Sequence, residues 1–431
     1  MADVRPFRGI RYDDRQAGAL SSNLGPTYDM ISPEKQRELL DRSQTNVIRL
    51  ELALDADPGE KLDGRYDSAA AMQANWFSAG ILRRDAEPSM YVIEESFNFR
   101  GARYRRFGLL AAVRLEDYDR GIILPHEYTR AGFVADRLHL MKATRANFSP
   151  LMVLFREPPG APISRALMDV VSNPPDANGS PPDMPAIRVW RITDPERLAT
   201  LTAAFKDTKL YIADGHHRYE AALLYRIQTR FGHRARSDEP SNFRIMNLIE
   251  IGDPGLFLLG YHRLVSNATG EELEALKRRL KTQFALRPWP ARLPLDSETI
   301  DSQLNRETRS TLVVGIAGLE GADLHLGVLR NPAHATSERE SSDYARLHTE
   351  VLREVFGEAR EPQVISYAAD PVEAIKNVKA GRRQLAFIMR ALSSSQFEGV
   401  VSQGQRLPPK STYFYPKLPA GVVMQSLDGV L

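Results

Sequence analysis

Residues 209–224 read Lys-Leu-Tyr-Ile-Ala-Asp-Gly-His-His-Arg-Tyr-Glu-Ala-Ala-Leu-Leu and predict a strand, a tight turn and a helix in succession. The apolar run Leu210–Ala213 has the length of a buried strand, and the Asp214-Gly215 pair breaks it. The helix formers that follow predict that a helix begins within a residue or two of Arg218.

Three side chains at this turn favour an anion: His216, His217 and Arg218. The first backbone N–H groups of a helix have no partner within the helix, and the helix dipole attracts negative charge there. Arg can hold two phosphate oxygens at once, and a neutral His can still donate a hydrogen bond. The sequence therefore predicts a phosphate site. The alternative is an ordinary Asp-Gly turn whose His-His-Arg run is exposed to solvent.

The composition excludes several classes of function. The 57 basic and 55 acidic residues give a formal net charge of +2, too little to attract nucleic acid at long range, so we expect no nucleic-acid partner. The chain has no cysteine, which excludes disulfides, thiolate nucleophiles, zinc–cysteine sites and iron–sulfur clusters. No stretch approaches the roughly 20 apolar residues of a membrane span, and the first residues lack a signal-peptide pattern. We expect a cytoplasmic protein without membrane contact.

A chain of 431 residues is too long for one ordinary core, and its pattern of helices and strands predicts an α+β protein. We expect an N-terminal region over residues 1–114, a central domain over 115–265 and a C-terminal region over 266–431. In the first region, Val47–Leu54 is typical of a strand. In the central domain, the Pro-rich residues 172–186 cannot continue a helix or a central strand, so they predict a surface insertion.

A second candidate site is Pro125-His126-Glu127-Tyr128-Thr129, which follows a short apolar strand. A Glu beside a His just past a strand end can act as a general base or a metal ligand, so His126 and Glu127 are candidate catalytic residues. The fourth residue after His126 is Arg130, which excludes the metalloprotease helix motif. The alternative is a polar loop.

The common nucleotide and hydrolase signatures do not occur in this chain. It has no Gly-x-Ser-x-Gly elbow, no Walker phosphate loop and no Gly-x-Gly-x-x-Gly after a strand. A nucleotide would therefore bind through a less common architecture.

Two of these segments resemble known proteins. Asp214–Arg218 with Glu220-Ala221-Ala222 resembles the phosphate-binding turn of the ParB/sulfiredoxin superfamily, in the form that free-serine kinases carry. Residues 125–129 resemble the upstream segment that holds the catalytic Glu of those kinases. The resemblance implies a ParB/sulfiredoxin-like central domain. The sulfiredoxin reaction itself is excluded, because it needs a cysteine.

Further motifs, spread over nearly the whole chain, resemble a larger family, domain of unknown function 1015. These motifs are Pro6-Phe7-Arg8-Gly9, Pro26-x-Tyr28-Asp29-x-Ile31-Ser32-Pro33, Asn46-Val47-x-Arg49-Leu50, Asp253-Pro254-Gly255, His262-Arg263-Leu264 and Pro409-Lys410-Ser411-Thr412-Tyr413-Phe414-Tyr415-Pro416-Lys417. Where members of that family commonly read Ala-Pro-Pro-Tyr-Asp, this chain has Leu-Gly-Pro-Thr-Tyr-Asp over residues 24–29.

The kinase resemblance implies a role for each candidate residue. Glu127 would deprotonate a substrate hydroxyl, while His216, His217 and Arg218 would hold the transferred phosphoryl group. Asp214, with Gly215 after it, would fix the turn or help a magnesium ion. A carboxylate base is sufficient for a hydroxyl nucleophile. Phosphoryl transfer depends mainly on positioning and charge neutralisation.

The function that follows is a nucleotide-dependent phosphotransferase acting on a small hydroxyl metabolite. Its implied cofactor is ATP or ADP with Mg²⁺, and free L-serine is the best candidate acceptor. A nucleotide-binding switch or scaffold with a protein partner is the main alternative, and a nucleotidase that uses water as acceptor is the third.

Overall fold

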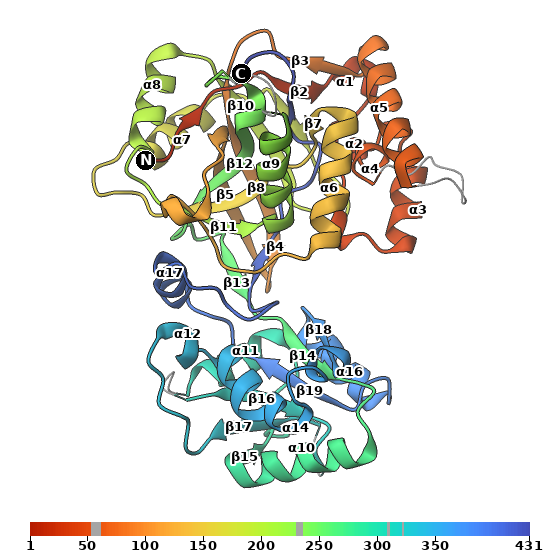
Figure 1. Cartoon of the computed structure of the whole chain (residues 1–431), viewed down its shortest axis with the longest axis vertical. Coiled ribbons are helices and arrows are strands. Elements are labelled where there is room, and N and C mark those ends of the chain that lie inside the picture. Colours follow the sequence, from red (N-terminus) through yellow and green to blue (C-terminus); the bar gives the residue numbers. More distant parts are fainter. Residues whose placement is uncertain (53–61, 230–235, 308–310, 321–322) are drawn as a thin grey trace. The chain divides into compact units, whose positions relative to one another are not determined.

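The computed structural model describes residues 1–52, 62–229, 236–307, 311–320 and 323–431 (Figure 1). These residues form two compact units, each described here by itself. Unit 1 comprises Met1–Leu256 together with Pro416–Leu431, and unit 2 comprises Phe257–Tyr415. The last residues of the chain therefore belong to the same unit as the first.

Unit 1 is built on a nine-stranded mixed sheet. Its strands in spatial order are β6 (Ile123–Pro125), β11 (Leu210–Asp214), β8 (Leu151–Phe155), β12 (Phe243–Glu250), β5 (Ala102–Arg114), β4 (Met90–Phe99), β10 (Ala186–Ile192) and β9 (Ala177–Gly179), with β1 (Val4–Arg5) paired to β5. The pairs β6–β11 and β8–β12 are parallel, and the other pairs are antiparallel.

Both faces of this sheet are covered, because its central strands carry apolar side chains on both sides. Along β12, Met246 and Leu248 belong to one buried cluster, and Phe243 and Ile245 belong to the other. Alternate residues of a strand point to opposite faces, so a strand buried on both faces is apolar throughout. The predicted phosphate turn, which follows β11, therefore adjoins a sheet that is packed on both faces.

Helices pack on both faces of the sheet. The helices of unit 1 are α1 (Asp14–Ala17), α2 (Leu20–Asn23), η1 (Tyr28–Met30), α3 (Pro33–Arg42), α4 (Ile48–Glu51), α5 (Leu62–Ser78), η2 (Tyr118–Arg120), α6 (Ala131–Thr144), α7 (Ile163–Val171), α8 (Pro195–Ala204), α9 (His216–Thr229) and η3 (Pro240–Asn242). Helices α6 and α9 lie side by side over the sheet (Figure 1). Buried residues of both helices join the apolar cluster on that face.

A smaller sheet brings the C-terminal residues into unit 1. Its strands in order are β3 (Leu82–Arg84), β2 (Gly9–Tyr12), β21 (Met424–Ser426) and β7 (Ala146–Asn147). Strand β21 pairs with β2 on one side and with β7 on the other. The C-terminal residues are therefore an integral part of the core of unit 1.

Unit 2 contains a six-stranded antiparallel sheet and a two-stranded ribbon. The sheet runs β15 (Phe284–Pro288), β17 (His325–Leu329), β16 (Val313–Ala317), β19 (Leu385–Met389), β14 (His262–Val265) and β18 (Ile365–Ala368), and the ribbon pairs β13 (Phe257–Leu259) with β20 (Tyr413–Tyr415). Its helices are α10 (Gly270–Gln283), α11 (Ser297–Asn305), α12 (Glu338–Ser341), α13 (Asp343–Arg346), the π-helical turn η4 (Leu347–Leu352), α14 (Arg353–Phe356), α15 (Glu361–Val364), α16 (Pro371–Lys379) and α17 (Ser394–Ser402).

The structure divides the chain differently from the three expected regions. Strands β4 and β5 come from residues 1–114, and β8, β11 and β12 come from residues 115–265, yet all five belong to one sheet. No division therefore falls at residue 114. The second division falls after Leu256, and residues 416–431 return to unit 1. The sequence pattern could not show this, because strand pairing and the return of the tail are long-range.

The expected strand over residues 47–54 is wrong for the part that the structure describes. Ile48–Glu51 form helix α4, and residues 53–54 lie outside the described residues. The side chain of Asn46 explains the helix. Its amide donates to the carbonyls of Ser22 and Leu24, and its oxygen accepts from the backbone N–H of Ile48. These bonds position the backbone so that a helix begins at Ile48. The apolar pattern of the sequence does not reveal such bonds.

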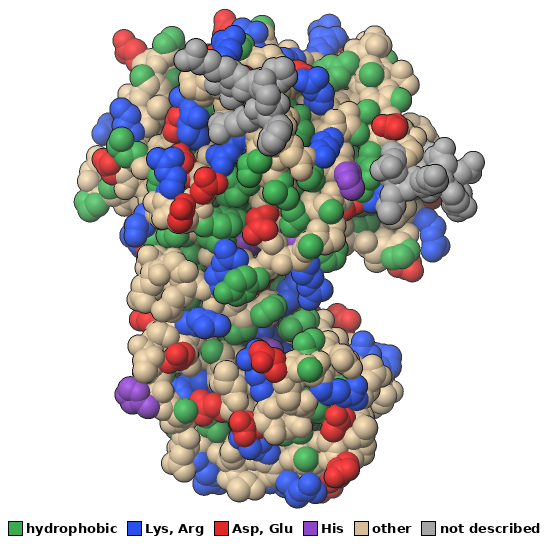
Figure 2. Space-filling model, in the orientation of Figure 1, with side chains coloured by type: hydrophobic (Ala, Val, Ile, Leu, Met, Phe, Trp, Pro, Cys, Tyr) green, Lys and Arg blue, Asp and Glu red, His purple; other side chains and the backbone are tan. Residues whose placement is uncertain are grey.

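The Pro-rich residues 172–186 behave largely as predicted. Apart from Ala186, where β10 begins, their only strand is the three-residue β9, which lies at the edge of the sheet beside β10. An edge strand tolerates neighbouring prolines, because one row of its backbone groups needs no partner strand. On the visible face of each unit, the basic and acidic side chains of the described residues are interspersed (Figure 2), in keeping with the small net charge.

Strand β21 gives a direct test of the role of the tail. Met424 is fully buried between β2 and β7. We expect Met424→Ala to lower the free energy of unfolding of unit 1 by about 2–5 kcal/mol, the usual effect of removing a buried large side chain. Val430→Ala is the control, because Val430 is exposed. Equal stability of the two variants in urea denaturation would show that the tail does not contribute to the core.

Candidate functional site

The predicted phosphate turn lies at the junction of β11 and α9. Strand β11 ends at Asp214, and α9 begins at His216, which confirms the predicted order of strand, turn and helix. Between them Gly215 has φ 101°, a conformation that other residues rarely adopt. A Cβ on Gly215 would also lie 3.0 Å from Cγ of Leu151. Both conformation and space therefore require glycine at this position.

Parallel pairing brings the second candidate segment to the same place. Pro125 of β6 lies opposite Ile212 of β11, so the residues that follow both strands leave the sheet at one edge. His126 Nδ1 donates to the carbonyl of Ile212 at 2.7 Å, and the backbone N–H of His126 donates to Nε2 of His216 at 3.2 Å. Glu127 follows His126 directly. Residues 90 positions apart thus form one cluster.

The two histidines at this junction pack edge to face, with ring centroids 4.5 Å apart. Burial lowers the pKa of His126, although the nearby Glu127 raises it, so the ring is neutral at pH 7. Only 1% of His126 is exposed. His126, expected as a catalytic residue, is therefore placed to tie β6 to β11 and to support His216.

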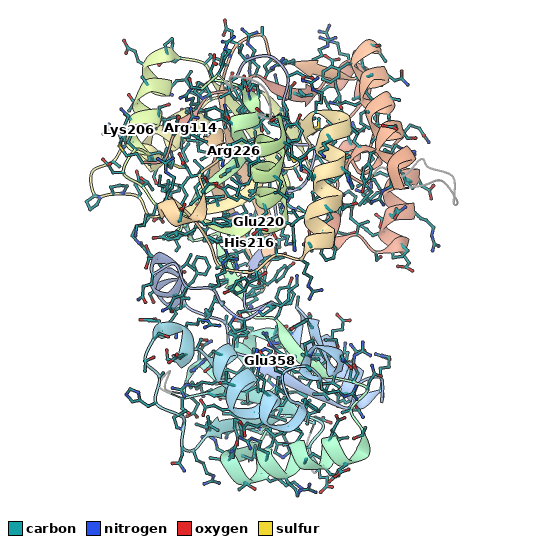
Figure 3. The ribbon with its side chains drawn as sticks, in the orientation of Figure 1. Arg114, Lys206, His216, Glu220, Arg226 and Glu358 are labelled. Carbon is teal, nitrogen blue, oxygen red and sulfur yellow. The ribbon has the colours of Figure 1, made fainter. Side chains whose placement is uncertain are left out.

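Thr129 and Glu220 form a second link between the two segments. The Thr129 hydroxyl donates to the carboxylate of Glu220, one turn after His216 in α9. Figure 3 shows His216 and Glu220 at the same end of this helix. The loop that carries Glu127 is thus fastened to α9 both before and after that residue.

Arg218 does not have the exposed position that a direct phosphate ligand needs. It is 3% exposed. Its Nη1 donates to the Ser149 hydroxyl at 2.9 Å and to the Pro150 carbonyl at 2.8 Å, and its Nη2 donates to Asp214 Oδ2 at 2.6 Å. The guanidinium therefore holds the turn against the segment before β8. Its removal would weaken the fold, so it is a poor probe of phosphate binding.

Asp214 is bound by two cations. Lys417 Nζ lies 2.6 Å from its Oδ1, and Arg218 Nη2 lies 2.6 Å from its Oδ2. Lys417 also lies 2.8 Å from Oδ2 of Asp29, whose Oδ1 accepts from the Thr27 hydroxyl at 2.7 Å. Lys417, Asp29 and Thr27 had no predicted role, although all three lie in or beside segments that resemble family motifs.

Charge balance keeps this cluster ionised. Burial would lower the pKa of Lys417, but the carboxylates of Asp214 and Asp29 raise it well above its usual value. Burial would likewise raise the pKa of Asp29, but Lys417 lowers it strongly. Each group thus compensates the desolvation of its neighbour.

The magnesium ion that the resemblance implies does not fit Asp214 as it stands. Mg²⁺ needs unshared oxygen ligands at about 2.1 Å, and both oxygens of Asp214 already accept from cations. Among the described residues, no group of three or more His, Asp or Glu side chains is arranged to hold a metal ion.

A cleft of about 560 Å³ opens beside the turn, at the start of α6. It is lined by Tyr28, Leu52, Arg65, Arg130, Gly132, Phe133, Asp136 and Arg137. The ring of Phe133 lies 5.1 Å from that of His217, which connects the cleft to the turn. The Arg137 guanidinium stacks on Tyr28 at 4.2 Å. The cleft therefore combines aromatic and cationic groups, and its size suits a small-molecule ligand.

The chain belongs to the DUF1015 family, described as proteins of unknown function, whose model matches residues 4–349. No curated protein sequence matches the chain. Among the helices that the structure describes, none combines the length and apolar character needed to span a membrane.

Solved structures resemble the chain at low identity. A variant of a free serine kinase in complex with AMP is 12% identical, with a TM-score of 0.36, and the match covers 71% of this chain and 87% of that one. A variant of that kinase in complex with ADP is 13% identical, with the same TM-score and coverage. A conserved hypothetical protein from Pyrococcus furiosus is 12% identical, with a TM-score of 0.35, over 73% of this chain and 93% of that one.

Gly215 provides the test of the turn. We expect Gly215→Ala to lower the free energy of unfolding by about 1–3 kcal/mol, because alanine must adopt the positive φ and displace Leu151. Gly132→Ala in α6 is the control, because nothing lies within 4 Å of its added Cβ. It should leave stability unchanged or raise it by up to about 1 kcal/mol. Equal effects in chemical denaturation would contradict the geometry of the turn.

Proposed function

We propose that this protein is a nucleotide-dependent phosphotransferase that acts on a small hydroxyl metabolite, with free L-serine as the best candidate and ATP or ADP as donor. The observation that carries the proposal is the parallel pairing of β6 with β11. It puts the segment with Glu127 beside the helix N-terminus that begins at His216. Such a pairing of a carboxylate base with an anion site is what transfer to a hydroxyl group needs. The motifs of both segments also support a ParB/sulfiredoxin-like class for this part of unit 1.

The turn supplies the anion-binding half of the site. The first backbone N–H groups of α9 lie just after the end of β11 and form the positive end of the helix dipole. The carboxylate of Asp214 does not oppose an anion, because Lys417 and Arg218 neutralise it. A phosphoryl group is the anion that suits several N–H donors in a row.

The cleft supplies the nucleotide-binding half. Phe133 is 46% exposed, so its ring is available for a base to stack on. Arg130 lines the same cleft and can pair with phosphate oxygens, whereas Arg65 is already paired with Asp136. Because the Phe133 ring contacts His217, a nucleotide in the cleft would have its phosphates near the turn.

The proposed step uses the residues of this chain in defined roles. Glu127 takes the proton of the acceptor hydroxyl, and the hydroxyl oxygen forms a bond to the terminal phosphorus. The bond from that phosphorus to the bridging oxygen breaks, and ATP leaves as ADP, or ADP as AMP. The N–H groups of His216 and His217 would hold the oxygens of the phosphoryl group during transfer.

The central prediction concerns Glu127. We expect Glu127→Gln to bind nucleotide with unchanged affinity and to lower the rate of phosphoserine formation by roughly 10²–10⁴-fold, the usual share of a general base. The assay incubates protein with L-serine, Mg²⁺ and either ATP or ADP, and measures phosphoserine by mass spectrometry. Glu196→Gln on the exposed face of α8 is the control and should retain full activity.

The same assay separates the alternatives. A nucleotide-binding switch would bind nucleotide without forming phosphoserine, and a nucleotidase would release inorganic phosphate without an acceptor. Equal phosphoserine formation by wild type and Glu127→Gln would remove Glu127 from the mechanism.

A second prediction tests the cleft. We expect Phe133→Ala to weaken nucleotide binding by about 3- to 10-fold, which corresponds to the stacking energy of an aromatic pair. Stability should change little because the ring is half exposed. Phe77→Ala in α5 is the matched control, since Phe77 is also exposed but lies outside the cleft lining. If calorimetry gives equal affinities for the two variants, the nucleotide does not use this cleft.

A further inference from the structure

One lysine lies between two carboxylates at the phosphate turn. Lys417 Nζ is 2.6 Å from Asp214 Oδ1 and 2.8 Å from Asp29 Oδ2. The remaining oxygens of these carboxylates are bound by Arg218 and Thr27. The ammonium is therefore the one group that both carboxylates share in this arrangement.

This arrangement has the geometry of a shared metal site with an ammonium group in place of the ion. Two carboxylates from different segments approach one cation from two sides, as they do around Mg²⁺ or Ca²⁺. The N–O separations of 2.6 and 2.8 Å are roughly 0.1–0.7 Å longer than metal–oxygen distances of about 2.1–2.5 Å. Only 10% of the Lys417 side chain is exposed, so the ammonium is fixed rather than a mobile surface charge.

The chain around Lys417 holds the ammonium in position. Arg106 Nη2 donates to the carbonyl of Pro416 at 2.6 Å, and Arg106 is itself paired with Glu95. On the other side, Leu418 is buried in the core of unit 1. The residues before and after Lys417 are thus both anchored, and the lysine enters the site from a fixed backbone.

We propose that Lys417 is the resident cation of this site, that it takes the place of a divalent metal ion between Asp29 and Asp214, and that removal of its ammonium creates a divalent-cation site there. The role of this cation beside a phosphate turn rests on the proposed function, whereas the exchange of ammonium for metal does not. Without the Lys417 ammonium, Arg218 alone would balance the charges of Asp214 and Asp29, and the excess negative charge would repel a phosphate.

The direct experiment is a titration of Mn²⁺, a spectroscopic probe for Mg²⁺, in the absence of nucleotide. Free Mn²⁺ is measured by electron paramagnetic resonance. We expect Lys417→Ala to bind one equivalent at least tenfold more tightly than wild type. The double variant Lys417→Ala with Asp29→Asn should lose that site, because one of the two carboxylates is gone.

Lys35→Ala is a matched control. Lys35 also bridges two carboxylates, Glu38 at 2.8 Å and Asp183 at 3.3 Å, but both of these are exposed. Its removal should create no Mn²⁺ site, because exposed carboxylates are not held together. Tight binding of one Mn²⁺ by wild type, or no gain in folded Lys417→Ala, would overturn the proposal.

A thermal readout covers the case in which Lys417→Ala is too unstable to titrate. A metal that binds only the folded state raises the melting temperature. Mn²⁺ should raise the melting temperature of Lys417→Ala by several degrees, and leave those of wild type and Lys35→Ala almost unchanged. The absence of such a rise would overturn the proposal.

A measurement of ADP binding distinguishes this proposal from the proposed function. In the presence of EDTA, wild type should bind ADP, and Lys417→Ala should bind ADP at least tenfold more weakly. Replacing EDTA by Mn²⁺ should restore the ADP affinity of Lys417→Ala. A wild type that binds no nucleotide while Lys417→Ala gains the Mn²⁺ site would reject the nucleotide function and leave the exchange of cations intact. Unchanged ADP affinity of Lys417→Ala in EDTA would overturn the role of the lysine.

Discussion

The ion pair between Asp214 and Lys417 is the interaction on which the arrangement of the candidate site depends. Asp214 ends β11 immediately before the glycine turn, and Lys417 lies in the C-terminal segment of unit 1. A largely buried carboxylate without a partner is destabilising, so the two cations at Asp214 stabilise this turn. Because Lys417 also binds Asp29, the same ammonium fixes three segments that are far apart in sequence.

This constraint has a direct chemical consequence. A phosphate site needs donors and low negative charge, and a bare aspartate at a helix start would oppose its ligand. Neutralisation by Lys417 and Arg218 leaves the N–H groups of α9 as the dominant feature. The neutral His126 supports His216 without adding a charge that would depend on pH near neutrality. In the proposed function, this arrangement would be ready for phosphate before any ligand binds, and such preorganisation is the main requirement for phosphoryl transfer.

The sequence predicted the features of this site that are local. A short apolar run, Asp-Gly and a set of helix formers define a strand, turn and helix within 16 residues, and the structure has them where expected. Other features depend on long-range contacts. Arg218 was expected to hold the phosphoryl group, and the structure shows it buried and bonded to Ser149 and Pro150, so its phosphate role remains a prediction. Residues 47–54 were expected as a strand, but bonds from Asn46 to the preceding segment start a helix. The partners of Asp214 could not be predicted either, since Lys417 lies about 200 residues away.

A structure of the wild-type protein with ADP and L-serine would test the account most directly. The account predicts that the terminal phosphate lies within about 3.2 Å of the backbone nitrogens of His216 and His217, a normal hydrogen-bond distance. Lys417 should still bridge its two carboxylates, and the serine hydroxyl should lie between the phosphate and Glu127. A nucleotide bound elsewhere in the protein, with no phosphate at the start of α9, would contradict it.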